Sequence, residues 1–400
     1  MNLIPFPNSM SANVDVVADA AQLVSRLRSR IPETDRLARL PDETVADLDE
    51  AGMFKLLVPA RRGGLQLDMP TFMDVLVELG RGDISAAWTV NILNCGAWFL
   101  TVMFPEHVQD QVYASANPRV ANVLHPRKAT IRNVPGGKLI EHGVWGFNSG
   151  VMHAGWDLLG IPITDEDGAV VDHALALLPI SDVRILDDWD TIGVRGSGSS
   201  TVEVRDVFVP EERYYSLSKT MAGDVPFVFD DGEFQYRQSF EASVVLLSIT
   251  VLGGCDAAIE LFMDKVGRRG IQHSHYAQAA AAPPVHLAIG EATAKIQAAK
   301  LLAKDVLTRM DSAARAGRSL THQENVELRR NGGLVAKLAW EGVDLLAEAS
   351  GASMMVSGNL LNRIWRDVRT GSLHAAHLPA TMFENYGRMV CGVENTPAVG

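Results

Sequence analysis

The chain has 400 residues, of which 47% are hydrophobic, and its formal net charge is −12 at pH 7. This length allows a large core and favours about two or three domains. The acidic balance argues against nucleic acid as a partner, because neutralising phosphates requires a basic face.

The cysteines and the terminus indicate a compartment. Cys95, Cys255 and Cys391 lie far apart in apolar settings, which is typical of a reducing environment without a disulfide framework. The N-terminus has neither the basic region nor the apolar core of a secretory signal. The uncharged run 242–255 is shorter than the roughly 20 residues that a bilayer span needs. We therefore expect a cytoplasmic protein without a membrane partner.

Residues 1–116 are predicted to form an α-helical domain. Apolar spacing predicts helices over 14–30, 42–51 and 70–79. Asp83 is placed to cap a helix over 84–102, and Pro105 is placed to start another.

The pattern changes after this domain and then changes back. Residues 117–215 contain strand-like runs separated by turn residues, which predicts a β domain. Residues 216–400 return to helical spacing and form the third predicted domain. Its long helices are predicted over 236–266, 283–316, 321–350 and 360–390. Thr321 and Glu324 have the spacing of a capping box. Composition and order together indicate an α+β fold.

The most informative segment runs from Trp189 to Pro210. Its first part, WDTIGVRGSGSST, is a loop with glycines and hydroxyl groups, and its second part, VEVRDVFVP, reads as a strand. Glycine lets the backbone approach a ligand closely, and N–H and O–H donors suit a phosphate or a heteroaromatic ring. Gly196 and Gly198 do not form a dinucleotide-binding motif, because the segment opens a strand instead of a helix and lacks the third glycine.

Three motifs together resemble one family. The loop motif is preceded by Gly-x-Trp-x-Phe-x-Ser-Gly-x-x-His-Ala-x-Trp at 143–156, and it is followed by Ile-Trp-Arg-Asp at 364–367 with His374 beyond. In this order they resemble the flavin-dependent monooxygenases of the acyl-CoA dehydrogenase fold, the oxygenase components of two-component aromatic hydroxylases such as 4-hydroxyphenylacetate hydroxylase. The resemblance implies an N-terminal helical domain, a central β-barrel-like domain and a C-terminal four-helix bundle, assembled as a homotetramer.

The resemblance also implies an activity. The protein would bind reduced FMN or FAD and react it with dioxygen, and the resulting C4a-hydroperoxyflavin would oxygenate an aromatic or other electron-rich small molecule. The protein would shield this adduct from water and orient the substrate. A separate NAD(P)H-flavin reductase would supply the reduced flavin, because the chain shows no nicotinamide-binding motif.

Site residues follow from the matching positions. The resemblance places Phe147 against the isoalloxazine ring and Ser149 at flavin N5, although a serine before a glycine is also common in ordinary turns. It assigns the other wall of the flavin site to Trp189, Arg195, Gly196, Ser197, Gly198 and Ser199. Arg269, or its neighbour Arg268, falls where related enzymes direct an arginine at the flavin of another subunit.

His374 is the candidate for substrate chemistry. By resemblance, Ala375 occupies the place of the glutamate base of many acyl-CoA dehydrogenases, and His374 lies beside it. A histidine can accept the hydroxyl proton of a phenol and so favour the electron-rich phenolate. The alternative is a core histidine bonded to backbone groups. His374 and His377 have a spacing that could hold a metal, but no acidic or cysteine partner accompanies them, so no metal is predicted.

Four weaker candidates for substrate contact complete the set. Asn91 shares a helix face with Trp88, Cys95 and Trp98, a stripe more typical of a core, but a buried amide must be hydrogen-bonded. The other three are Asn94, His125 and His153.

Other functions remain open from the sequence. An acyl-CoA dehydrogenase-like enzyme would use Glu241 as its base and would hold oxidised FAD tightly. An N-oxygenase of the same fold would act on an amine or amino sugar. A non-catalytic flavin-binding relative is disfavoured, because Ser149, Arg195 and His374 are present together.

Overall fold

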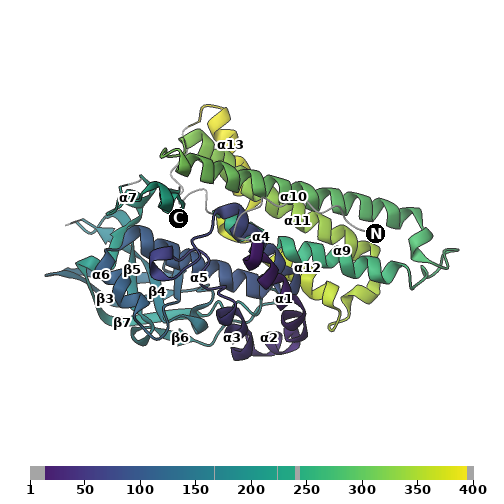
Figure 1. Ribbon diagram of the computed structural model, residues 1–400, viewed down its shortest axis with the longest axis horizontal. Coiled ribbons are helices and arrows are strands. Elements are labelled where there is room, and N and C mark those ends of the chain that lie inside the picture. The colour runs from purple at the N-terminus through teal and green to yellow at the C-terminus, as the bar shows by residue number, and fades with distance from the viewer. Residues whose placement is uncertain (1–13, 166, 223, 239–243, 394–400) are drawn as a thin grey trace.

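The computed structural model describes residues 14–165, 167–222, 224–238 and 244–393. Strands gather at one end of the molecule, the long helices α10 and α11 run along its length, and the helices α4 and α5 lie between these two parts (Figure 1). The N-terminal helices are α1 (Val14–Ser29), α2 (Ile31–Leu37), α3 (Asp42–Glu50), α4 (Met69–Gly82), α5 (Ile84–Met103) and α6 (Glu106–Tyr113). The short α2 was not predicted.

Capping residues start the two central helices. Asp68 accepts a hydrogen bond from the Thr71 N–H at the start of α4. Asp83 accepts one from the Ser85 N–H at 2.8 Å, which confirms it as the cap of α5. These bonds satisfy backbone donors that have no partner within the helix, so they fix where each helix begins.

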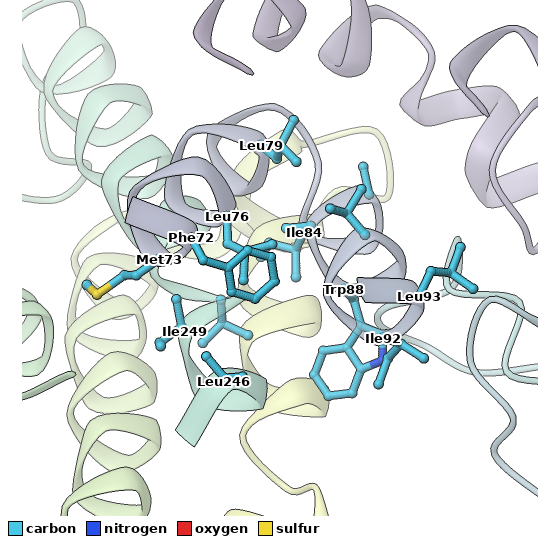
Figure 2. Close-up of a cluster of buried hydrophobic side chains, with 14 of the residues drawn as sticks. Phe72, Met73, Leu76, Leu79, Ile84, Trp88, Ile92, Leu93, Leu246 and Ile249 are labelled. Atoms are coloured by element: carbon cyan, nitrogen blue, oxygen red, sulfur yellow. The ribbon is translucent and has the colours of Figure 1, made fainter. Parts of the chain in front are cut away.

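Helix α5 forms the centre of the core. It spans 20 residues without a charged side chain, and all of them except Cys95 are buried. Figure 2 shows Ile84, Trp88 and Ile92 of α5 near α4 side chains such as Phe72 and near Leu246 and Ile249 of the C-terminal region. Within the described residues, α5 and the stretch 245–266 are long and apolar enough to cross a membrane, but 94% and 72% of their most apolar windows are buried. Their apolar character therefore serves the core.

In the described part of the chain, the β region consists of two four-stranded sheets with the orders β1-β4-β5-β8 and β2-β3-β7-β6. Their strands are β1 (Val120–Val123), β2 (Lys128–Val134), β3 (Gly137–Trp145), β4 (Trp156–Thr164), β5 (Val170–Pro179), β6 (Arg184–Leu186), β7 (Thr201–Pro210) and β8 (Tyr214–Ser216). Strand β3 pairs antiparallel with β7, and Trp145 lies opposite Val202. This register places the turn after β3 beside the glycine-rich loop before β7, so two of the three sequence motifs meet in space.

The C-terminal region contains α8 (Val245–Ile249), α9 (Leu252–Val266), α10 (Pro283–Arg315), α11 (His322–Ala349), α12 (Leu360–Gly371) and α13 (Pro379–Val390). The capping box of Thr321 and Glu324 is confirmed at the start of α11. The single helix predicted over 236–266 is wrong: residues 231–237 form a 3₁₀ segment, and α8 and α9 are separated at Thr250 and Val251. Glu241 lies outside the described residues.

The helix predicted over 360–390 is also interrupted. A 3₁₀ turn, Ala375–His377, separates α12 from α13, and its N-cap is His374, whose side chain accepts a hydrogen bond from the Ala376 N–H. Pro379 then starts α13, where its fixed backbone angle is well tolerated. The chain therefore turns at His374 between the two helices.

Candidate functional site

A row of buried hydroxyl groups connects the two motifs of the β region. Ser149 Oγ lies 2.7 Å from Ser199 Oγ, and Ser199 Oγ lies 2.7 Å from Ser197 Oγ. The indole Nε1 of Trp88 donates to Ser149 Oγ at 3.0 Å. Because an indole N–H can only donate, Ser149 must accept this bond, and its own proton remains available for Ser199 or for a ligand.

Phe147 presents its ring to solvent beside this row. Its side chain is 67% exposed although Asn148 and Ser149 are buried, and its backbone has a φ of 61°. The ring meets Trp189 edge to face with centroids 5.9 Å apart, and the Arg127 guanidinium lies 5.6 Å from its centroid. A non-glycine residue in the left-handed region is strained, and such strain is often found at ligand sites. An exposed aromatic face next to a hydroxyl donor suits a flat heteroaromatic ligand.

Two residues of the glycine-rich loop bond to protein groups in this structure. Arg195 Nε donates to the Asp35 carbonyl at 2.6 Å, and its Nη1 reaches Asp190. The Gly196 N–H donates to Ser85 Oγ at 3.1 Å, and a Cβ at Gly196 would lie 2.2 Å from Thr34 Cγ2. The resemblance implied flavin contacts for both residues. The contacts shown hold the loop against the N-terminal helices, and at Gly196 this close packing requires a glycine. The flavin contacts stay predictions.

The rest of the loop has mixed roles. Gly198 has a φ of 55°, which suits a glycine at this turn. Trp189 Nε1 donates to the Arg195 carbonyl at 3.1 Å and so keeps its ring at the site mouth beside Phe147. Ser197 accepts at its carbonyl from the Gly150 N–H at 2.8 Å. The loop and the turn after β3 therefore form one hydrogen-bonded unit.

A buried ion cluster fixes this unit to the helices. Arg363 of α12, only 4% exposed, contacts Asp83 Oδ1 at 2.9 Å, Asp367 Oδ2 at 2.9 Å and Asp35 Oδ1 at 3.1 Å. Asp367 Oδ1 accepts from the Val194 N–H of the loop at 2.7 Å. One cation thus links the N-terminal helices, α12 and the loop. Arg363 was not among the predicted site residues, although its i,i+4 spacing to Asp367 on a helix was a usable signal.

His374 differs from the proton acceptor that the sequence suggested. Its Nδ1 accepts from the Ala376 N–H at 3.1 Å, and burial lowers the pKa of the ring to about 4. A neutral ring that accepts at Nδ1 carries its proton on Nε2. His374 can therefore donate a hydrogen bond to a substrate oxygen, but Nε2 cannot accept a proton from it. The ring lies against Trp88 with centroids 5.8 Å apart, so Trp88 touches both Ser149 and His374.

The neighbouring His377 is part of the core. It is fully buried, its Nε2 bonds to the Gly371 carbonyl at 2.8 Å, and burial lowers its pKa to about 3. The rings of His377 and His374 have centroids 5.8 Å apart, so the buried His377 ring packs against His374 and supports it.

The two asparagines of α5 have different roles. Asn94 is fully bonded: its oxygen accepts from the Leu57 N–H, and its Nδ2 donates to the carbonyls of Met53 and Val90. Asn94 therefore has a structural role, and these bonds do not favour the substrate contact predicted for it. Asn91 is equally buried, but its Nδ2 has no partner among the described residues. A buried donor without a partner is costly, so Asn91 remains a candidate for a ligand contact.

The two histidines of the β region also differ. His153 is buried just after Gly150, and its Nε2 has no partner among the described residues. Burial, followed by Arg39 and Arg119, lowers its pKa to about 4, so the ring is neutral and remains a contact candidate. His125 is exposed and meets His173 edge to face at 5.9 Å.

Arg269 lies three residues after the end of α9. It donates to the Ser350 carbonyl at 2.7 Å and to Ser353 Oγ at 2.9 Å. These bonds join α9 to the turn after α11. The contact with the flavin of another subunit, which the resemblance implied, stays a prediction.

Helices, two β-sheets and a long-helix bundle around this site define the acyl-CoA dehydrogenase fold. The family model described as acyl-CoA dehydrogenase, N-terminal domain, matches residues 15–116, and the one described as acyl-CoA dehydrogenase, C-terminal domain, matches residues 245–379. The predicted fold class is therefore confirmed.

Individual relatives narrow the class. The chain is 30% identical over 367 residues to the flavin-dependent monooxygenase oxygenase subunit HsaA of Rhodococcus jostii, covering 91% of this chain and 95% of that protein. It is 27% identical over 398 residues to the oxygenase component of p-hydroxyphenylacetate 3-hydroxylase from Acinetobacter baumannii, covering 97% and 92%. The structure of XiaF from Streptomyces sp. in complex with FADH2 and glycerol matches with a TM-score of 0.89 at 29% identity, covering 97% of each chain.

The chain belongs to the oxygenase components of the flavin-dependent monooxygenases. It is a monooxygenase that works with reduced flavin, as the resemblance implied. The name oxygenase component also implies a separate reductase that supplies the flavin.

Proposed function

We propose that this monooxygenase hydroxylates an aromatic substrate that carries an oxygen substituent, with reduced flavin seated against Phe147 and Ser149. The observation that carries the proposal is Trp88, which binds Ser149 through its N–H and packs against His374 with its ring. One rigid, buried side chain thus fixes two hydrogen-bonding groups relative to each other. One of the relatives named above, p-hydroxyphenylacetate 3-hydroxylase, acts on an aromatic compound according to its name, which supports the substrate class.

The residues present fit a flavin. Phe147 offers an exposed aromatic face, and Ser149 offers a buried hydroxyl whose proton is not needed by Trp88. The chemistry that a bound reduced flavin supplies is the two-electron activation of dioxygen, which delivers one oxygen atom to the substrate and one to water. Either FMN or FAD would meet these contacts.

The chain's own groups have defined tasks in this proposal. Ser149 holds a hydrogen bond at the flavin edge, and Trp88 keeps the hydroxyl in place. His374 donates a hydrogen bond from its Nε2–H to the substrate oxygen, which lowers the pKa of a phenol so that it releases its proton to solvent more readily as it binds, and the resulting phenolate ring is richer in electrons. The buried surroundings of Ser149 and Ser199 exclude water from the reacting centre.

The first experiment is rapid mixing of the protein, loaded anaerobically with reduced FMN or FAD, against oxygenated buffer. An absorbance phase that precedes flavin reoxidation, and that a substrate shortens, would support the proposal and identify the better flavin. Immediate reoxidation with stoichiometric hydrogen peroxide, with every flavin and with a panel of phenols, would contradict it.

A second experiment separates hydrogen-bond donation from base catalysis at His374. His374→Gln retains an N–H donor but cannot take up a proton, whereas His374→Ala retains neither. We expect hydroxylation to survive better in the glutamine variant than in the alanine variant. Equal loss in both variants would contradict the donor role.

The assembly and location belong to the same proposal. Leu287 and Leu301 on α10 are 75% and 52% exposed, which supports burial of the bundle surface in a homotetramer. Light scattering of the purified protein gives the mass that tests this. A cytoplasmic location, where a flavin reductase is available, completes the proposal and can be tested by cell fractionation.

A further inference from the structure

Behind the turn that carries Phe147 and Ser149 lies a buried carboxyl group that the proposed mechanism does not use. Asp157 stands at the start of β4 and is 0% exposed. Its Oδ2 accepts from Asn148 Nδ2 at 2.6 Å, and Asn148 is also 0% exposed. Asn148 stands between Phe147 and Ser149 in the chain, so this bond connects the carboxyl group directly to the candidate flavin contacts.

Asp157 and Asn148 together lack one hydrogen-bond donor. Asn148 Oδ1 and Asp157 Oδ1 each lack a hydrogen-bond partner among the described residues. If Asp157 is ionised, both atoms are acceptors and neither can satisfy the other. A proton on Asp157 would let the acid donate to Asn148 Oδ1 while Asn148 Nδ2 donates to the acid, which closes a two-bond ring between acid and amide. One proton therefore satisfies both atoms, and buried polar atoms are rarely left without partners.

The surroundings do not favour a charge there. Burial raises the pKa of Asp157 to about 7, although hydrogen bonds from Asn148 and the Leu158 backbone lower it. The residues opposite Asp157 in the sheet are Ala121 and Leu178.

Charged groups on the packed elements are distant or exposed. Strands β1 and β4 contain no other titratable side chain, and β5 contains Asp172 and His173 at the far end of its pairing with β4. Strand β2 brings Lys128 and Arg132, which are exposed. No neighbouring cation on these elements is placed to compensate an ionised Asp157.

We propose that Asp157 is a positioning residue that carries a proton in the resting enzyme and, through an acid–amide pair with Asn148, fixes the turn that presents Phe147 and Ser149. The inference rests on the proposed function for its catalytic consequence, but the protonated pair is a property of the flavin-free protein. Ionisation at higher pH would break one of the two bonds and place a charge behind Ser149. The enzyme would then protect its oxygen-reactive state less well.

Infrared spectroscopy of the flavin-free protein tests the protonated pair. We expect carbonyl bands of protonated carboxylic acids at pH 6, one of which is lost in Asp157→Asn and shifts in Asn148→Ala. Asp311 is a matched control, because it is also buried and burial raises its pKa to about 7, but it lies on α10 and bonds to Gln238 and the Met69 backbone. Asp311→Asn should remove a different band.

Rapid mixing with reduced flavin tests the positioning. With a pKa of about 7, the ionised fraction of Asp157 rises from about a tenth at pH 6 to about nine-tenths at pH 8. The lifetime of the phase before flavin reoxidation should therefore fall by up to about tenfold over this range in the wild type and in Asp311→Asn. In Asp157→Asn, whose amide mimics the protonated acid, the lifetime should stay long at both pH values.

The outcomes separate the two ideas. If the wild type shows no phase before reoxidation, the proposed function fails while the infrared result still decides the state of Asp157. If no acid band at pH 6 depends on Asp157, or if Asp157→Asn keeps the wild-type pH dependence, the positioning proposal is overturned. If Asp157→Asn does not fold, the absence of any acid band that shifts in Asn148→Ala overturns it equally.

Discussion

Two buried polar assemblies meet at the junction of the three parts of the molecule, and they are built in opposite ways. Around Arg363, one cation is shared by three carboxylates of the protein, and each carboxylate already contacts it. Around Ser149, the groups are uncharged hydroxyls and an indole N–H, and one hydroxyl proton remains free to turn toward a ligand. The closed assembly suits holding parts together, and the open one suits binding. The glycine-rich loop contributes to both assemblies: Val194 bonds to Asp367 of the closed one, and Ser197 and Ser199 belong to the open one.

The largest effect is expected from breaking the closed assembly. Arg363→Met removes the cation and leaves Asp83 and Asp367 buried without compensation. The free energy of unfolding should fall by about 3–5 kcal/mol, because removing one partner of a buried ion pair costs more than the pair contributes. Urea unfolding followed by fluorescence measures it. The same change at Arg318, whose ion pair with Glu324 is at the surface, is the control and should have little effect. A loss at Arg363 no larger than at Arg318 would show that water compensates the acids.

The open assembly should affect activity more than stability. Ser149→Ala removes the free hydroxyl proton, and we expect hydroxylation to fall by about 100-fold, as for removal of one preorganised donor from an active site. The reduced flavin should still be consumed, so hydrogen peroxide should rise as product falls. Product and peroxide are measured together. Ser181→Ala, at an exposed serine of the same region, is the matched control. An unchanged ratio of product to peroxide would remove Ser149 from the mechanism.

Trp88 lets the two functions of one side chain be separated. Trp88→Phe keeps an aromatic ring beside His374 but loses the N–H that holds Ser149. One lost hydrogen bond of about 1–1.5 kcal/mol corresponds to about tenfold in rate, less than the loss of Ser149 itself. Combined with Ser149→Ala, the tryptophan change should add little, because its partner is already gone. Fully additive losses would mean that Trp88 acts through packing instead.

The sequence predicted the fold from local signals and the site only in outline. The caps of α5 and α11 depend on residues two or three positions apart, so they could be read directly. The contact from Trp88 to Ser149 spans 61 positions, and that from Arg195 to Asp35 spans 160. Only the fold brings such groups together, which is why neither contact was predicted from the sequence. The break of the last helix at His374 was not predicted. Histidine is not one of the usual N-cap residues, so the sequence gives no signal that the His374 side chain accepts the Ala376 N–H.

The smallest effect concerns the histidines that support the open assembly. His377 is neutral when folded, with a pKa lowered to about 3 by burial, against about 6.5 in an unfolded chain. On acidification the unfolded chain takes up the proton first, so the stability that this histidine contributes is present above pH 6.5 and is lost as the pH falls. Between pH 7 and pH 6 the loss is about 0.7 kcal/mol. His377→Gln retains a donor for the Gly371 carbonyl but does not titrate, so its unfolding midpoint should depend less on pH than that of the wild type. The same change at the exposed His107 serves as the control. Equal pH dependence in wild type and His377→Gln would mean that water reaches His377 and that the support beneath His374 is less closed than its burial indicates.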